Sequence, residues 1–165
     1  MISIWLTPAK EDSAYLQEIV NALAFEYQAP VFYPHCTLYS PTDLEGYELD
    51  EILEKAGEKI GSLYVTMNKL DHTINIWKTV FIELEKSLEL SNLQHNLVSL
   101  IPEPKPYDFL PHISLIYKKM TAEQQEEIIH NLAVRNSYKM DRIVAMKTGP
   151  DVKHWEKIAE VCFHA

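Results

Sequence analysis

The chain has 165 residues with a formal net charge of −9, and 47% of its residues are hydrophobic. This composition is typical of a soluble globular protein and excludes a wholly disordered chain. The negative charge argues against binding of long nucleic acid, because a protein that binds it needs many Lys and Arg side chains. The charge still allows a small phosphate ester in a local pocket. The length predicts a single domain over residues 1–165.

The ends of the chain and its cysteines favour an intracellular protein. The segment Met1–Pro8 lacks the basic start and the long apolar run of a signal peptide. No apolar stretch reaches the roughly 18 residues of a membrane span. Cys36 and Cys162 lack the spacing of metal ligands and predict two reduced thiols. We therefore expect a cytoplasmic monomer with no membrane partner.

Up to residue 85, two stretches have apolar residues at helical spacing and four are short and rich in β-branched or aromatic residues. Gly61 is expected to end the second helix. The expected helices are 12–27 and 49–60, and the expected strands are 2–6, 33–39, 62–72 and 75–85.

The rest of the chain repeats this mixture of helices and strands. Thr121–Gln124 has the form of a capping box and predicts the start of a helix. Pro102–Pro106 holds three prolines and predicts a stiff loop. The expected helices are 90–101 and 121–133, and the expected strands are 111–117, 137–147 and 155–164. The order predicts an α+β fold that divides near residue 74 into two similar halves.

Both halves contain the same short motif. Residues 34–38 read Pro-His-Cys-Thr-Leu and residues 111–115 read Pro-His-Ile-Ser-Leu. Composition alone predicts well below about 0.05 occurrences of this pattern, so two copies are a strong signal. We call the four residues from His35 to Leu38 the first tetrad and those from His112 to Leu115 the second tetrad.

On a strand, side chains two residues apart point to the same face. His35 and Thr37 therefore share one face, as do His112 and Ser114, while the residues between them point to the core. If the halves pack about a pseudo-two-fold axis, the four polar groups line one cleft. Two imidazoles and two hydroxyls suit a phosphodiester, because one imidazole can take a proton from water and the other can give one to the leaving oxygen.

The tetrads have two other possible interpretations. A histidine on a half-buried strand is often a structural hydrogen-bonding group, although a matched pair is harder to explain in this way. A metal site with two histidine ligands is the other alternative, but no carboxylate or cysteine ligand lies at the usual spacing. We expect no metal and no cofactor.

With these tetrads, the sequence resembles the 2H phosphoesterases, whose pattern is two H-x-[ST]-h tetrads with h hydrophobic. The resemblance is to the cyclic phosphodiesterase branch and covers nearly the whole chain. It includes the opening strand, both motif strands, an aromatic-rich strand and the last strand. These segments are Ile2–Pro8, Pro34–Leu38, Pro111–Tyr117, Trp77–Phe81 and Trp155–Cys162.

The resemblance implies a bilobal fold with a central cleft, antiparallel sheets and helices outside. It implies metal-independent hydrolysis of a small cyclic phosphate nucleotide: ADP-ribose 1″,2″-cyclic phosphate, or nucleoside 2′,3′-cyclic phosphates opened to 2′-phosphates. His35 and His112 would be the acid–base pair, with His112 as the base, and Thr37 and Ser114 would bind phosphate. Alternatives are a 2H enzyme of 2′,5′-linked or RNA-end phosphodiesters and a non-catalytic nucleotide-binding module.

Aromatic residues at matching positions are further candidates for substrate contact. Trp5 and Trp77 could stack on a purine, although a tryptophan on a strand is often a core residue. Tyr117 lies three residues past Ser114 and would reach the site only from a bulge or a strand end. Cys162 has no cysteine partner in 48–60, where plant members of the branch would have one, so a redox-regulated lobe is not expected. Cys36 is expected to be a small core residue.

Overall fold

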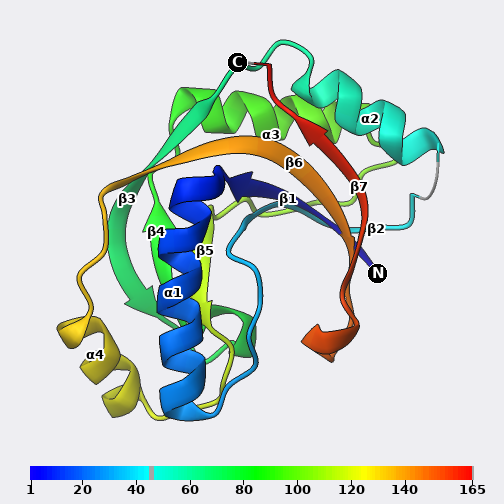
Figure 1. Ribbon diagram of the computed structural model, residues 1–165. Helices are drawn as coiled ribbons and strands as arrows, with labels where there is room; N and C mark the ends of the chain where they lie inside the picture. Colours follow the sequence, from blue (N-terminus) through cyan, green and yellow to red (C-terminus); the bar gives the residue numbers. More distant parts are fainter. Residues whose placement is uncertain (45–46, 165) are drawn as a thin grey trace.

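Figure 1 shows the computed structural model of the chain, which describes residues 1–44 and 47–164. Helices and strands alternate irregularly along the chain, which confirms the predicted α+β class. The α-helices are α1 (Lys10–Tyr27), α2 (Tyr47–Gly57), α3 (Leu88–Leu100) and α4 (Ala122–Asn131). The strands are β1 (Ile2–Pro8), β2 (Cys36–Thr42), β3 (Leu63–His72), β4 (Val80–Leu84), β5 (His112–Ile116), β6 (Ser137–Lys147) and β7 (Glu156–Cys162).

The described strands form one antiparallel sheet in the order β1-β2-β5-β4-β3-β6-β7, in which β6 also pairs with β1. The long strand β6 serves both lobes. Its first residues, 137–140, pair with β3, and residues 142–147 lie between β1 and β7. One lobe therefore holds β3, β4 and β5, and the other holds β1, β2 and β7. The two expected sheets are parts of one sheet, which β6 continues from lobe to lobe (Figure 1).

The two motif strands meet where the lobes join. Cys36 of β2 pairs with Ile113 of β5, and both are the second residue of their tetrad. An antiparallel pair at equivalent positions has a local two-fold axis between its members. In the same register, His35 lies opposite Ser114 and Thr37 lies opposite His112. The pairing of two middle residues thus brings the four polar side chains to one face of the sheet.

Helices bury the other face of these two strands. Helix α1 packs on β5 and β1, and α3 packs on β2 and β3, so each helix contacts the motif strand of the opposite half (Figure 1). Cys36, Leu38, Ile113 and Leu115 are fully buried in this core. Their burial gives each motif strand one apolar and one polar face, which is the alternation predicted from the sequence.

The expected strand at 75–85 is wrong in its first part. A short 3-10 helix, η1 (Ile76–Lys78), precedes β4, and the Asn75 side chain accepts a hydrogen bond of 3.0 Å from the Trp77 backbone N–H. An asparagine that bonds the backbone two residues on favours a turn over a strand. This cap removes Trp77 from the sheet and places it on the loop that follows β3.

Other boundaries differ by a few residues. Strand β2 begins at Cys36 instead of residue 33, and α2 ends at Gly57 instead of near Gly61. The last expected strand begins one residue late, at Glu156, after a second 3-10 helix, η2 (Val152–His154). The predicted capping box is confirmed, because Thr121 and Gln124 exchange both hydrogen bonds at the start of α4. None of the described helices combines the length and apolarity needed to cross a membrane.

Candidate active site

All seven side chains predicted to form the site line one cavity of about 570 Å³ between the lobes. Four come from the tetrads and three are aromatic. They are Trp5, His35, Thr37, Trp77, His112, Ser114 and Tyr117. The structure thus brings together side chains from β1, β2, η1 and β5 and from the residue that follows β5, although these elements are far apart in the sequence.

The two imidazoles are held in the same way. Nδ1 of His35 lies 2.7 Å from the Tyr33 carbonyl oxygen, and Nδ1 of His112 lies 2.8 Å from the Leu110 carbonyl oxygen. A carbonyl oxygen can only accept, so both Nδ1 atoms carry the proton that they donate. In each neutral ring, Nε2 is then free to accept a proton. Each tetrad therefore holds its histidine in one tautomer through a backbone atom two residues earlier.

His35 is the more enclosed of the two histidines. It is 8% exposed, and its ring is stacked on Trp5 with 3.5 Å between ring centroids and 9° between planes. Burial lowers the pKa of His35 to about 4, because a charged imidazolium loses its hydration there, and the Tyr33 carbonyl only partly opposes this. The stacked indole of Trp5 is itself 3% exposed and bonds Ser3 through Nε1. Trp5 therefore contacts His35 directly and has little surface left for a substrate.

His112 has a more open and more charged environment. The ring of Phe81 meets it edge-on at 5.4 Å between centroids. Burial lowers the pKa of His112, the hydrogen bond to the Leu110 carbonyl opposes that shift, and the positive charge of Lys78 adds to it.

The two hydroxyls of the tetrads have different partners. Ser114 donates to the Trp77 carbonyl oxygen at 2.7 Å, which ties β5 to the η1 turn. Within the described residues, the Thr37 hydroxyl has no hydrogen-bond partner and is exposed to the cavity. Thr37 can therefore donate to an incoming oxygen at once, whereas Ser114 must first turn its hydrogen away from Trp77.

Aromatic rings line one side of the cavity. Tyr117 follows the end of β5, so the strand end brings it in, as the sequence required. Tyr117 stacks on Phe32 at 3.8 Å, meets Trp77 edge-on at 5.1 Å and lies 6.0 Å from Trp155. Burial raises the pKa of the Tyr117 phenol, so it stays a neutral hydrogen-bonding group. Trp77 is 39% exposed, and its ring can meet a planar base.

Other side chains line the cavity as well, among them Trp155, Tyr107 and Lys78, which the sequence did not predict. Trp155 contacts both Trp5 and Trp77, and its Nε1 donates to the Gly149 carbonyl oxygen at 2.8 Å. Trp155 lies in a segment that marked the last strand, and Lys78 directly follows Trp77, but neither position carries a pattern that predicts chemistry.

Cys36 lies beneath the site and does not face it. It is fully buried, and burial raises the pKa of its thiol to about 12, which agrees with the expected core role. Cys162 is an exposed free thiol. Within residues 1–44 and 47–164, no three His, Cys, Asp or Glu side chains gather closely enough to hold a metal ion.

The chain is similar to known proteins over nearly its whole length. The sequence profile of the family described as "Cyclic phosphodiesterase-like protein" matches residues 1–163. A cyclic phosphodiesterase of Arabidopsis thaliana is 22% identical over 169 residues, which cover 97% of this chain and 93% of the plant protein.

Two solved structures show the same fold at low sequence identity. E. coli LigT in complex with 3′-AMP aligns with a TM-score of 0.67 and 13% identity, covering 99% of this chain and 98% of LigT. The protein TT0787 of Thermus thermophilus aligns with a TM-score of 0.64 and 14% identity, covering 98% of this chain and 97% of that one. LigT has also been solved with ATP and with NADP+. The chain shares this fold over nearly its whole length.

Proposed function

Because the chain belongs to the family of cyclic phosphodiesterase-like proteins, within the 2H phosphoesterases, we propose that it hydrolyses small cyclic phosphodiesters in the cavity between its lobes. One observation carries the proposal. The His35 and His112 imidazoles hold the same Nδ1–H tautomer and, together with the hydroxyls of Thr37 and Ser114, line a single cavity. Two preset imidazoles in one cavity form an acid–base pair that needs no further protein group to move a proton each way.

The proposed reaction is an attack of water on phosphorus. A neutral imidazole accepts a proton from water through Nε2 while the water oxygen forms a new P–O bond. The other imidazole, protonated, donates its Nε2 proton to the ribose oxygen as its bond to phosphorus breaks. Thr37 and Ser114 donate hydrogen bonds to the non-bridging oxygens, where negative charge accumulates. The product is a phosphate monoester, and the pair of histidines ends with one proton, as it began.

We assign the base role to His35 and the acid role to His112. The resemblance predicted the opposite assignment, with His112 as the base, and that assignment stays a prediction. Deeper burial lowers the pKa of His35 to about 4, so this ring is neutral at pH 7 and is poised to accept a proton. His112 is less enclosed and receives the first proton of the pair more readily, since its pKa is lowered less. A bound phosphate anion raises the pKa of both rings and stabilises the protonated one.

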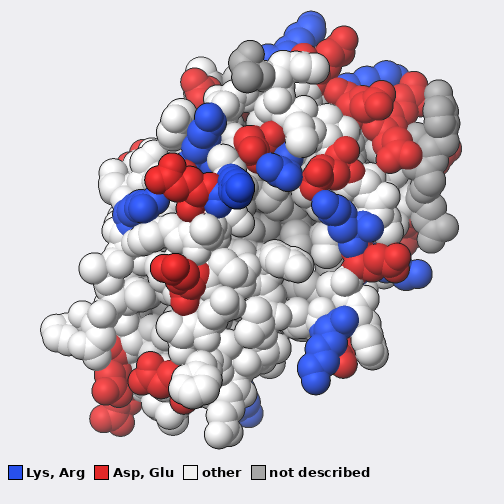
Figure 2. All heavy atoms as spheres, viewed as in Figure 1, with Lys and Arg blue, Asp and Glu red and all other residues white. Residues whose placement is uncertain are grey.

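For the substrate we propose a nucleoside 2′,3′-cyclic phosphate or ADP-ribose 1″,2″-cyclic phosphate, with a base against Trp77 and Trp155. The support is the exposed indole of Trp77, the neighbouring ring of Trp155 and the likeness to a plant cyclic phosphodiesterase. Figure 2 shows acidic and basic side chains interspersed over one face of the molecule, and the chain as a whole is acidic. A small nucleotide fits this charge better than a long RNA.

The first experiment incubates the purified protein, with EDTA present, with a 2′,3′-cyclic nucleotide and separately with ADP-ribose 1″,2″-cyclic phosphate. Phosphorus NMR then follows each reaction. We expect a phosphate monoester, and formation of the 2′-phosphate would show that the P–O3′ bond breaks. Conversion only of RNA ends or 2′,5′-linked substrates would replace this proposal with the RNA-processing alternative. Binding of a nucleotide without turnover of any of these would indicate a non-catalytic module.

A further inference from the structure

Lys78 is the one lysine or arginine that the described residues bring to the wall of the cavity. It is the last residue of η1, and its Nζ lies 4.5 Å from the centroid of the Phe81 ring, which in turn contacts His112. No carboxylate in the described parts of the chain forms an ion pair with Lys78. An uncompensated cation beside the second tetrad is therefore available to an anion in the cavity.

We propose that the turn between β3 and β4 is an anion-binding element, in which Lys78 contacts the substrate phosphate and Gln125 of α4 holds the turn in position. This inference rests on the proposed function, because it assigns the phosphate to that cavity. Lys78 is the substrate-contacting residue. Gln125 is a positioning residue, since it lies outside the cavity lining and acts through the turn.

The charge of the reacting group explains the need for such a lysine. A cyclic phosphodiester is an anion, and the chain that must bind it carries a net charge of −9. The tetrads offer two neutral hydroxyls and at most one imidazolium. A lysine at the wall adds a positive charge that attracts the anion and stabilises the charge that builds up as water attacks. The lowered pKa of His112 supports the placement, because the Lys78 charge is one of its causes.

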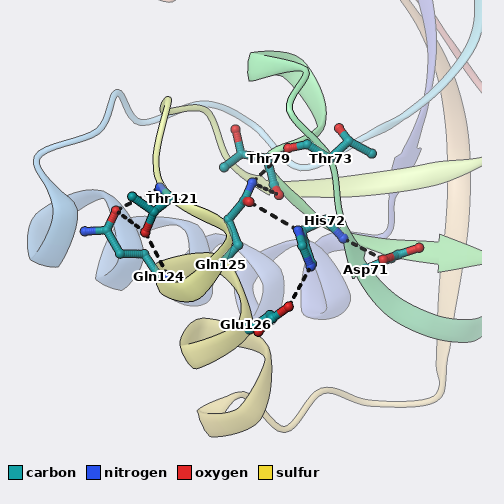
Figure 3. Close-up of polar contacts among 8 residues, drawn as sticks. All are labelled: Asp71, His72, Thr73, Thr79, Thr121, Gln124, Gln125 and Glu126. Carbon is teal, nitrogen blue, oxygen red and sulfur yellow. Dashed lines mark hydrogen bonds and ion pairs between the residues drawn. The ribbon is translucent and has the colours of Figure 1, made fainter.

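Gln125 holds the two ends of the turn with one side-chain amide (Figure 3). It is 3% exposed, and Nε2 donates to the Thr73 carbonyl oxygen at 2.8 Å and to the Thr79 carbonyl oxygen at 3.0 Å. Its Oε1 lies 3.1 Å from Nδ1 of His72, which must be the donor. The buried amide of Gln125 therefore has partners for both its nitrogen and its oxygen. Its loss would leave the Thr73 carbonyl oxygen without this donor, and would leave the Thr79 carbonyl oxygen with only the 3.4 Å bond from the Thr73 backbone N–H.

Further hydrogen bonds connect the two residues that Gln125 holds, Thr73 and Thr79, to η1 and Lys78. The Thr73 hydroxyl donates to the Lys78 carbonyl oxygen at 2.6 Å, and the Thr79 hydroxyl bonds the Ile76 and Lys118 carbonyl oxygens at 2.9 and 3.0 Å. The residues before and after η1 are therefore fixed by side chains as well as by Gln125. A lysine on so constrained a turn loses little backbone freedom on binding an anion.

The test of Lys78 uses inorganic phosphate as the probe, with binding measured by calorimetry and the His112 pKa measured by NMR. Lys78→Met removes the charge and keeps the length of the side chain, and Lys78→Arg keeps the charge. Lys86→Met is the matched control, because Lys86 also lies over an aromatic ring, 5.7 Å from the Phe109 centroid, but outside the cavity.

We expect Lys78→Met to weaken phosphate binding about ten- to hundredfold, as for a lost hydrogen bond to a charged group, and to raise the His112 pKa. Lys78→Arg should keep more of the phosphate binding than Lys78→Met does, because it keeps the charge, and Lys86→Met should bind phosphate as the wild type does. Equal binding by Lys78→Met and wild type would overturn the proposal. Both readouts are independent of turnover, so an inactive wild-type protein would contradict the proposed function while leaving this test decisive.

The test of Gln125 is a double-mutant cycle with Gln125→Met and Lys78→Met. If Gln125 acts through Lys78, Gln125→Met weakens phosphate binding in the wild type and has no further effect in Lys78→Met. A purely structural role would lower the melting temperature and leave phosphate binding unchanged, or would add the same loss in both backgrounds, and either result would overturn the positioning role. Thr79→Val, which removes the hydroxyl that bonds the Ile76 and Lys118 carbonyl oxygens, tests the same link if Gln125→Met does not fold.

Discussion

The two tetrads hold their histidines by the same bond and surround them with different neighbours. Each Nδ1 donates to the carbonyl oxygen two residues earlier, at 2.7 Å for His35 and 2.8 Å for His112. Trp5 then covers the face of His35, whereas the rings of Phe81 and His112 meet at a steep angle of 71°. The repeated sequence therefore sets the tautomer of both rings, and the surrounding lobes set how readily each ring takes a proton.

This difference gives the two histidines of a near-symmetric site distinct roles in proton transfer. Two equivalent imidazoles would exchange roles freely, and a fraction of the protein would hold the proton on the unproductive ring. Unequal burial favours the proton on His112 over His35 before substrate binds. The difference between Trp5 and Phe81 as neighbours is thus a functional feature in our proposal.

The largest expected effect is the loss of either imidazole. His35→Ala and His112→Ala should each lower kcat for a cyclic nucleotide by about a thousandfold, within the usual range for general acid–base groups. Steady-state kinetics on the purified variants gives the ratio, and circular dichroism shows whether each variant keeps its fold. Near-wild-type turnover by either folded variant would refute the paired mechanism. His95→Ala is a suitable control, because His95 lies on α3, away from the cavity.

The pH dependence of kcat/KM should also reflect the unequal pair. The active free protein holds one proton on the two imidazoles, and burial lowers the pKa of both from the ordinary 6.5. The profile should therefore be bell-shaped with its maximum below pH 6.5, and kcat/KM should fall about tenfold per pH unit on the alkaline side. Rate measurements from about pH 3.5 to 8.5 test this, because the acid side of the profile follows the His35 pKa of about 4. A flat profile, or a maximum above pH 7.5, would contradict the acid–base pair in this environment.

Stability should respond to the burial of His35 in the acid range. Its pKa is about 4 in the folded protein and about 6.5 when unfolded, so the unfolded state binds the proton first. The stabilising effect of the neutral ring is complete above pH 6.5 and is lost as the pH falls toward 4, by about 3 kcal/mol in total. Urea unfolding at several pH values should show a flatter curve for His35→Gln than for the wild type. The same slope in both proteins would contradict the lowered pKa, and His112→Gln should flatten the curve less.

The sequence predicted part of this comparison between the tetrads. The part that it did not predict has physical causes. The alternation of strand side chains predicted that His35 and Thr37 share a face, because that geometry is local. The pairing of Cys36 with Ile113 and the stacking of Trp5 on His35 depend on how distant segments pack, which no local pattern encodes. The η1 turn was missed because Asn75 bonds the backbone in place of the expected strand, and with it the position of Lys78 was missed as well.

The smallest expected effects separate the two hydroxyls. Thr37→Val removes a hydroxyl with no partner among the described residues, and should lower kcat/KM about tenfold with little change in stability. Ser114→Ala also leaves the Trp77 carbonyl oxygen without its 2.7 Å donor, so it should cost about 1 kcal/mol of unfolding free energy as well as activity. Kinetics and urea unfolding on both variants give the two quantities. Equal stability of the two variants would show that Ser114 does not secure the η1 turn, and the tetrads would then differ only in their imidazoles.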